Sequence, residues 1–124
     1  MKFPIRYNRA PLETAPLPWR EIKKCLVDLG TQESGGPNSL RLNLSKDGFL
    51  EIRSTPETDD PERHFLVYIS CRAYWTHVLE IYRHARTIEP DLVLFDSQEG
   101  VFHDPATFEP LAIAQRNFQK SRDA

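Results

Sequence analysis

The segment from Cys71 to His103, CRAYWTHVLEIYRHARTIEPDLVLFDSQEGVFH, constrains the fold of this chain more than any other. Its first half carries large apolar side chains three and four residues apart, a spacing that places them on one face of a helix. The members of this stripe are Trp75, Val78, Leu79, Tyr82 and Ala85. We therefore predict an amphipathic helix over residues 72–88, which ends at Glu89-Pro90 because proline disfavours the α conformation in the residue before it.

A strand and a turn follow this helix. The apolar run DLVLF predicts a buried strand, and the short segment VFH predicts its partner strand or the stub of one. Between them lies Asp96-Ser97-Gln98-Glu99-Gly100, whose residue types are common in turns. The unit therefore brings an acidic turn to the surface.

The segments before this unit predict one helix and several strands. Pro18 suits the first turn of a helix, and apolar residues at helical spacing extend that helix to Leu29. SLRLNLSKDGFLEIRS alternates apolar and polar residues around Asp47-Gly48, which predicts a β-hairpin. HFLVYIS is nearly all apolar and predicts a central strand, whereas KFPIRY contains a proline and predicts at most a short edge strand. TQESGGPN has the composition of a loop.

The end of the chain predicts a last helix with Thr107 as its N-cap. From the order of these elements we expect an α+β fold. Its antiparallel or mixed sheet would have four to five strands, with two to three helices packed mainly on one face. Residues 1–124 would form a single domain, with 1–17 as an extended Pro-rich N-terminal arm and 119–124 as a frayed tail.

Periodicity within each element also predicts the hydrophobic core. The expected core residues are Trp19, Ile22, Leu26, Leu42, Leu50, Ile52, Phe65, Val67, Trp75, Leu79, Tyr82, Val93 and Phe95.

Composition restricts the class of protein. With 40% hydrophobic and 27% charged residues among 124, the chain matches ordinary globular domains. The formal charge of −2 argues against a general nucleic-acid binder, which usually carries a basic surplus. No apolar run approaches the roughly 18 residues of a membrane span, and the N-terminus lacks the apolar stretch of a signal peptide. We therefore expect a cytoplasmic protein with no membrane or direct nucleic-acid contact.

No metal or cofactor is expected. His77, Glu80 and His84 share a helix face, but the two histidines lie seven residues apart, or roughly 10 Å along a helix axis. Cys25 and Cys71 lack the spacing of a metal knuckle and are typical of small buried thiols.

One group of residues has the chemistry of acid–base catalysis. Asp96, Glu99, His103 and Asp104 cluster around the turn that follows the last clear strand. The same residue types are equally typical of an ordinary turn and a helix entry, and no nucleophile elbow or phosphate loop accompanies them. We therefore assign no catalytic residue and expect that the protein is not an enzyme.

Acidic and aromatic residues make a better case for a binding surface. Acidic patches steer association with a basic partner, and exposed aromatic side chains serve as interface anchors. The alternative is a loop whose charges are merely solvated. The predicted partner-binding residues are Glu57, Asp59, Asp60, Glu62, Asp96, Gln98, Glu99 and Tyr74.

The run DLVLFDSQ, followed by a turn and VF, resembles the closing segment of small immunity proteins from bacterial contact-dependent and polymorphic toxin systems. Their corresponding strand ends in Asp-(Pro/Ser)-Gln before a turn and a short partner strand. The resemblance covers roughly residues 72–103, and Ser97 stands where the family usually has proline. It implies a non-catalytic toxin inhibitor that binds a cognate toxin domain, often a basic nuclease, and blocks its active site or substrate groove.

Two other functions stay open at this stage. One is a small enzyme or ligand-binding protein that uses the His/Asp/Glu cluster at the end of the sheet. The other is a structural subunit or adaptor, which the sequence does not separate from a toxin inhibitor.

Overall fold

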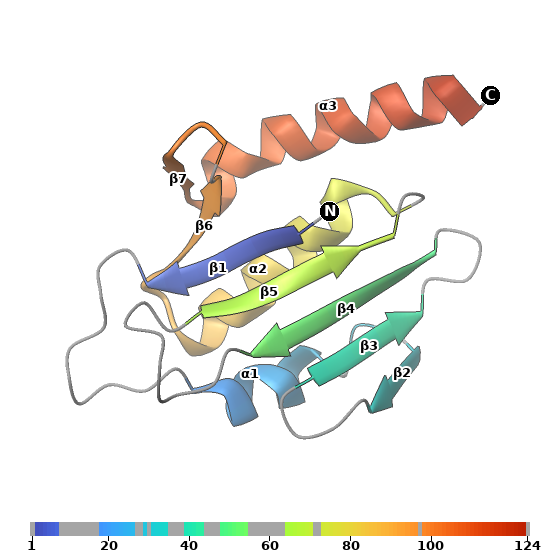
Figure 1. The fold of residues 1–124 in the computed structure, drawn as a ribbon. Coiled ribbons are helices and arrows are strands. Elements are labelled where there is room, and N and C mark those ends of the chain that lie inside the picture. The colour runs from blue at the N-terminus through green and yellow to red at the C-terminus, as the bar shows by residue number, and fades with distance from the viewer. Residues whose placement is uncertain are drawn as a thin grey trace.

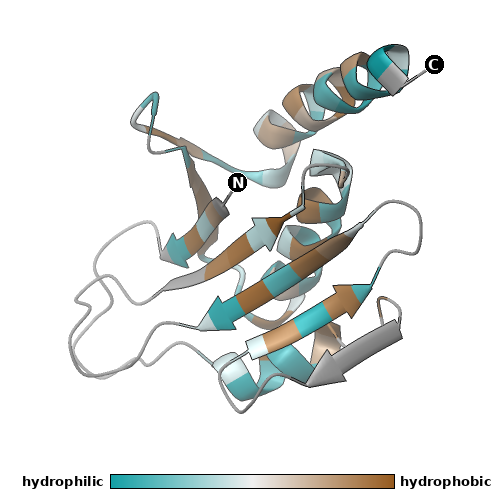
Figure 2. Ribbon diagram, turned by 45° about the vertical axis from the view of Figure 1, so that its right-hand side comes forward, coloured by the Kyte–Doolittle hydropathy of each residue, from teal (hydrophilic) through white to brown (hydrophobic). Residues whose placement is uncertain are grey.

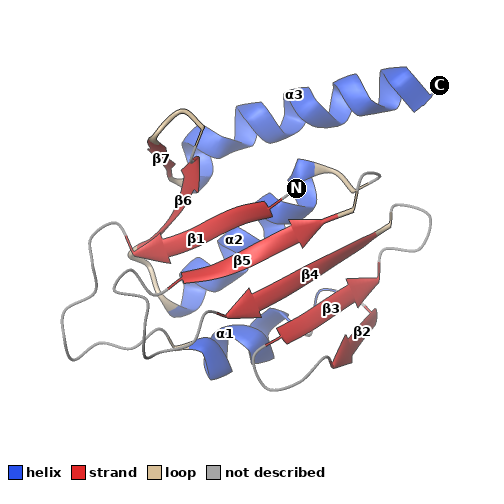
Figure 3. Ribbon diagram, in the orientation of Figure 1, coloured by secondary structure: helices blue, strands red, loops and turns tan. Residues whose placement is uncertain are grey.

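The computed structural model describes residues 2–7, 18–26, 29, 31–34, 39–43, 48–54, 64–70, 73–96 and 98–123. Within these ranges the chain forms one antiparallel sheet and three helices (Figures 1 and 3). In chain order the elements are β1 (Lys2–Tyr7), α1 (Trp19–Leu26), β2 (Thr31–Ser34), β3 (Ser39–Asn43), β4 (Phe49–Ser54), β5 (His64–Ile69), α2 (Trp75–Ile88), β6 (Leu92–Asp96), β7 (Val101–His103) and α3 (Pro105–Asp123). The expected α+β class is confirmed.

The expected sheet of four to five strands is too small. In the described part of the chain, seven strands pair in the order β2-β3-β4-β5-β1-β6-β7, each antiparallel to its neighbours. The segment TQES, predicted as loop, forms β2 and pairs with β3 from Thr31↔Asn43 to Ser34↔Leu40. It is polar throughout, so it carries no alternation of apolar residues from which a strand can be predicted.

β1 lies inside the sheet, which corrects the prediction of an edge strand. It pairs with β5 from Lys2 to Arg6 and with β6 only from Ile5 to Tyr7. Pro4 therefore lies beyond the end of the ladder to β6, where a missing N–H group removes no hydrogen bond from that ladder. Figure 1 shows this strand between β5 and β6.

The expected β-hairpin and the central strand are confirmed. β3 and β4 pair with Leu40 opposite Ile52 and Leu42 opposite Leu50. β5 lies between β4 and β1. Residues 44–47 and 71–72, which the sequence analysis placed in the hairpin and at the start of the second helix, lie outside the described residues.

One face of the sheet is covered by helices. Apolar and polar residues alternate along the strands (Figure 2), and α1 and α2 lie behind the sheet in Figure 1. Buried residues of the strands form one core cluster with buried residues of these helices. α3 packs along α2 and beside β7. None of the helices described for this chain covers the opposite face, and none is long and apolar enough to cross a bilayer.

Most of the predicted core is confirmed. Eight of its members are buried: Ile22, Leu26, Leu42, Leu50, Ile52, Val67, Leu79 and Tyr82. Trp19 and Trp75 are half-buried and pack against this core. The burial of Phe65 lies outside what the structure describes.

The predicted orientation of β6 is wrong. Leu92 and Leu94 are buried, whereas Val93 and Phe95 lie on the other face and are half-buried. Every residue of LVLF is apolar, so the sequence does not show which alternate set points inward. A shift of one residue reverses that choice for a whole strand.

α3 begins and ends differently from the prediction. Asp104, and not Thr107, is the residue at its start: the Asp104 carboxylate accepts a hydrogen bond from the Thr107 N–H at 2.8 Å. Thr107 Oγ1 in turn accepts one from the Asp104 N–H at 3.1 Å, which makes a reciprocal cap. The helix continues through Asp123, so residues 119–123 of the predicted frayed tail are helical.

Candidate functional site

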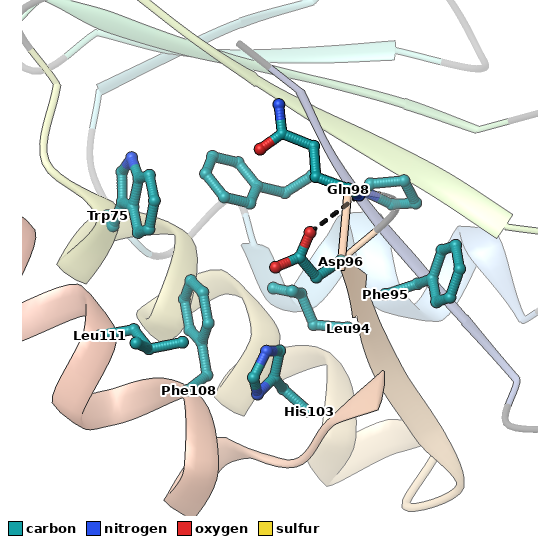
Figure 4. A pocket seen from close by; sticks show the side chains of 10 residues that line it. Trp75, Leu94, Phe95, Asp96, Gln98, His103, Phe108 and Leu111 are labelled. Atoms are coloured by element: carbon teal, nitrogen blue, oxygen red, sulfur yellow. Dashed lines mark hydrogen bonds between the residues drawn. The ribbon is translucent and has the colours of Figure 1, made fainter. Parts of the chain in front are cut away.

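A pocket of about 280 Å³ opens between β1, β6, β7, the start of α2 and the first half of α3. Its lining residues come from β1 near the N-terminus and from α2, β6, the turn at Gln98, β7 and α3 in the second half of the chain. They are Phe3, Pro4, Trp75, Leu94, Phe95, Asp96, Gln98, His103, Phe108 and Leu111 (Figure 4).

Aromatic rings form the inner wall of the pocket. The Phe3 ring meets Trp75 edge-on at 5.3 Å between centroids and Phe108 at 6.1 Å. Trp75 and Phe108 are nearly parallel, with an interplanar angle of 10° and centroids 6.3 Å apart. Such contacts orient the rings specifically, so the wall is preformed.

A single carboxylate faces this aromatic wall. Asp96 Oδ1 accepts hydrogen bonds from the N–H groups of Gln98 and Glu99, at 3.0 and 3.2 Å. The other carboxylate oxygen points into the space beside Trp75 and Phe108 (Figure 4). The turn that holds this carboxylate closes with a bond from the Gly100 N–H to the Asp96 carbonyl, and Gly100 has a φ of 67°, which glycine adopts without strain.

Two contacts attach this end of the sheet to the helices. The Tyr82 hydroxyl on α2 lies 3.0 Å from the carbonyl of Leu92 and 2.6 Å from that of His103, and these two acceptors share its single proton. Burial raises the pKa of Tyr82 to about 12, so the hydroxyl keeps its proton at neutral pH. The Trp75 N–H donates to Oε1 of Gln115 at 2.9 Å, which ties the start of α2 to α3.

Exposed apolar side chains lie on the two elements that follow the turn. Six large hydrophobic residues are exposed among those described, and all but Ile88 lie on β7 or α3: Val101, Phe102, Leu111, Ile113 and Phe118. We call the turn 98–100, β7 and residues 105–118 of α3 the β7–α3 surface. Acidic Glu99 lies at one end of it and basic Arg116 at the other.

Three of the predicted partner-binding residues lie together here. Asp96 and Gln98 line the pocket, and Glu99 is exposed in the same turn. Tyr74 is half-buried outside the pocket lining, where its ring stacks on His77 and the Arg116 guanidinium lies 5.3 Å from it. Glu57, Asp59, Asp60 and Glu62 lie outside the described residues.

The predicted His/Asp/Glu cluster is divided between two tasks. His103 lines the pocket with Asp96, and its ring lies 6.0 Å from that of Phe108. Asp104 caps α3 instead, and the hydrogen bond from the Thr107 backbone lowers the pKa of its carboxyl group. The cluster therefore contributes a histidine and a carboxylate to the pocket, and its other members lie in the turn and in the cap.

The histidine-bearing face of α2 has local partners. His84 Nδ1 lies 2.9 Å from the backbone carbonyl of Glu80, and Cys25 is a half-buried free thiol whose Sγ lies 3.5 Å from the carbonyl of His84. Over the residues that the structure describes, no three His, Cys, Asp or Glu side chains converge closely enough to hold a metal ion.

The pocket contains residues that the sequence analysis did not assign to a site. Phe3 belongs to the strand predicted at the edge, while Phe108 and Leu111 belong to the last helix, which the sequence analysis linked to no site. The alternation of Phe3 with Ile5 was the available signal that KFPIRY has a buried face. No local pattern shows that these residues meet.

The uncovered face of the sheet carries arginines over aromatic rings. The Arg6 guanidinium lies 4.0 Å from the ring centroid of Phe95, and that of Arg41 lies 4.2 Å from Phe49. Arg53 pairs with Glu51 on the same face at 2.5 Å. Arginine and aromatic residues are enriched at protein interfaces, but here the charges are already engaged with neighbouring rings and with a carboxylate.

A scan against protein-family models finds no match to this chain, and neither does a search of the curated proteins.

Proposed function

We propose that this protein is a non-catalytic inhibitor that binds a partner protein through the β7–α3 surface. The observation that carries the proposal is a preformed pocket whose neighbouring elements, β7 and α3, carry exposed apolar side chains. Val101, Phe102 and Leu111 are each more than 40% exposed. Exposed apolar side chains beside a pocket are typical of protein interaction sites, and binding energy concentrates where a pocket receives an anchor residue.

The proposed partner is a basic toxin domain, such as a nuclease. Two arguments support this choice: the resemblance of residues 72–103 to immunity proteins, and the acidic turn beside the pocket. Carboxylates at the rim of an interface accelerate association with a basic partner and select against acidic ones. In this proposal the protein acts in the cytoplasm, where it blocks the toxin by stoichiometric binding.

The test begins with a pull-down of proteins from the organism that produces this protein. The wild-type chain and the double variant Asp96→Lys/Glu99→Lys serve as baits, and proteins retained by wild type alone are identified. Each candidate is then purified and titrated against both baits. The proposal expects a 1:1 complex that the double variant weakens at least about tenfold, or about 1.4 kcal/mol. It also expects that expression of the partner stops cell growth unless the wild-type chain is present.

Two results contradict the proposal. One is a partner whose expression does not affect growth. The other is a toxin whose affinity and salt dependence are unchanged in the double variant, because charges in an interface alter at least one of the two. A thermal melt of the double variant is the control for folding, since Asp96→Lys also removes the hydrogen bonds that the Asp96 carboxylate accepts from Gln98 and Glu99.

A ligand-binding protein is the second candidate, and one observation favours it. Asp96 and His103 both line a pocket with aromatic walls, the combination expected of a site for a small polar ligand. This candidate predicts that a small molecule occupies the pocket when no protein partner is present.

A further inference from the structure

We propose that the pocket receives the side chain of an arginine from the partner protein. This inference rests on the proposed function and specifies the anchor that the partner supplies. It follows from the arrangement of one site: a carboxylate oxygen of Asp96 is directed into a cavity whose walls are mostly aromatic and aliphatic, with His103 and Gln98 as the other polar residues of the lining.

The carboxylate of Asp96 favours a positively charged ligand in the pocket. Both N–H groups that bond Asp96 attach to the same oxygen, and within the described part of the chain no lysine or arginine pairs with this side chain. A carboxylate can accept more bonds than these two, and charge-assisted bonds are the stronger ones. A positively charged donor that enters the pocket therefore finds an acceptor held in place by the turn.

The aromatic wall favours the same occupant. Trp75 is the ring type that attracts cations most strongly, and Phe3 and Phe108 adjoin it. The aliphatic stem of a long basic side chain would lie along Leu94 and Leu111 while its charged end reaches Asp96.

A guanidinium group fits better than an ammonium group. It is planar, so it lies flat against an aromatic ring, and it is more weakly hydrated than an ammonium group, so it loses less on entering an apolar site. It also carries several N–H donors in one plane, which can serve Asp96 and the exposed Gln98 amide at the pocket rim together.

The test uses the fluorescence of Trp75 in the full chain. The protein has two tryptophans, so Trp19→Phe leaves Trp75 as the only one. The probes are Nα-acetylarginine N-methylamide and the corresponding lysine and citrulline derivatives. Citrulline has nearly the shape of arginine without its charge. So small a ligand is expected to bind in the millimolar range.

The proposal predicts that the arginine derivative binds at least about tenfold more tightly than the citrulline derivative, and more tightly than the lysine derivative. Asp96→Asn keeps the oxygen that accepts from the turn but removes the charge, so it should abolish the preference for arginine over citrulline. Glu80→Gln removes an exposed carboxylate of α2 that lies outside both the pocket lining and the β7–α3 surface, and should change the affinity less than about twofold.

Equal binding of the arginine and citrulline derivatives would overturn the inference. So would an unchanged preference in Asp96→Asn, or no response of Trp75 at concentrations about tenfold above the millimolar range. Its failure is separable from that of the proposed function. If the probes fail while the toxin still binds in a manner that depends on Asp96 and Glu99, only the arginine anchor is wrong. If the probes bind but no toxin does, the pocket is a cation site and the proposed function is wrong.

Discussion

The centre of the sheet and the β7–α3 surface are built from similar residue types but used in opposite ways. In the centre, Ile52 and Val67 are fully buried between neighbouring strands and helices. On the β7–α3 surface, Ile113 is 46% exposed and Phe118 63% exposed. Apolar side chains left in water contribute little to folding, so those of the second region are available to a partner.

We expect the centre of the sheet to determine the stability of the fold and the β7–α3 surface to determine binding of the partner. Substitutions in the centre should unfold the protein, and those on the β7–α3 surface should leave it folded but weaken the complex. Tyr82 is placed between the two regions, because its ring is buried in the core while its hydroxyl holds β6 and β7.

The largest expected effect is in the centre. Leu79 on α2 is only 4% exposed, so Leu79→Ala removes buried methyl groups and leaves a cavity. The free energy of unfolding should fall by about 2–5 kcal/mol in a denaturant melt. A loss below roughly 0.5 kcal/mol, the range of surface substitutions, would show that α2 does not hold the core.

An intermediate effect is expected at Tyr82. Tyr82→Phe removes the donor to the Leu92 and His103 carbonyls and should cost about 1–3 kcal/mol. Hydrogen exchange should become faster in β7 than in β4 if this hydroxyl holds β7 in place. Equal acceleration in both strands would contradict a role for Tyr82 at the junction of the two regions.

The raised pKa of Tyr82 gives this prediction a pH dependence. Its folded pKa of about 12 exceeds the ordinary value of 10.0, so the folded state keeps a proton that the unfolded state has lost. This contribution to stability is complete below pH 10 and disappears as the pH rises from 10 to about 12. Chemical denaturation across this range should therefore show a steeper loss of stability in wild type than in Tyr82→Phe.

Local patterns predicted the elements but not how they meet. The spacing of Leu79 and Tyr82 placed α2 correctly, and the alternation of Leu40 and Leu42 placed β3. By contrast, the position of β1 inside the sheet depends on its pairing with β5 and β6, which are distant from β1 in the sequence. Such pairing between distant segments cannot be predicted from the local sequence.

Local patterns likewise predicted one part of the candidate site and not the other. The acidic turn was predictable because Asp96, Gln98 and Gly100 have the side chains and backbone freedom that turns require. The aromatic wall behind the turn was not predictable, because Phe3 and Phe108 come into contact only when β1 and α3 pack together in the folded chain. In β6 the run LVLF is apolar throughout, so the sequence did not show which alternate residues are buried.

On the β7–α3 surface, Phe118→Ala should change the free energy of unfolding by no more than about 0.5 kcal/mol, because this side chain is mostly in water. If α3 contacts the partner, the same substitution should weaken the complex about tenfold, or about 1.4 kcal/mol. Ile88→Ala is the matched control: Ile88 is also an exposed apolar residue on a helix, but it lies at the end of α2. Equal effects of the two substitutions on binding would contradict the assignment of the surface.

The smallest effect is expected for the ion pair between Arg83 on α2 and Glu109 on α3. Both side chains are more than 40% exposed, so water screens their attraction. A double-mutant cycle with Arg83→Gln and Glu109→Gln should give a coupling of about 0.2–1 kcal/mol that decreases with added salt. A larger, salt-independent coupling would mean that charge, rather than packing of Phe108 and Ala112, holds α3 on α2.

The most direct test of the division between the two regions is hydrogen exchange of the protein with and without its purified partner. The account predicts that binding slows exchange in residues 98–118, which cover the turn, β7 and the first part of α3. Exchange in β3 and β4, on the far side of the sheet from β7, should be unchanged. Protection confined to β3 and β4, with residues 98–118 unaffected, would contradict the assignment of binding to the β7–α3 surface.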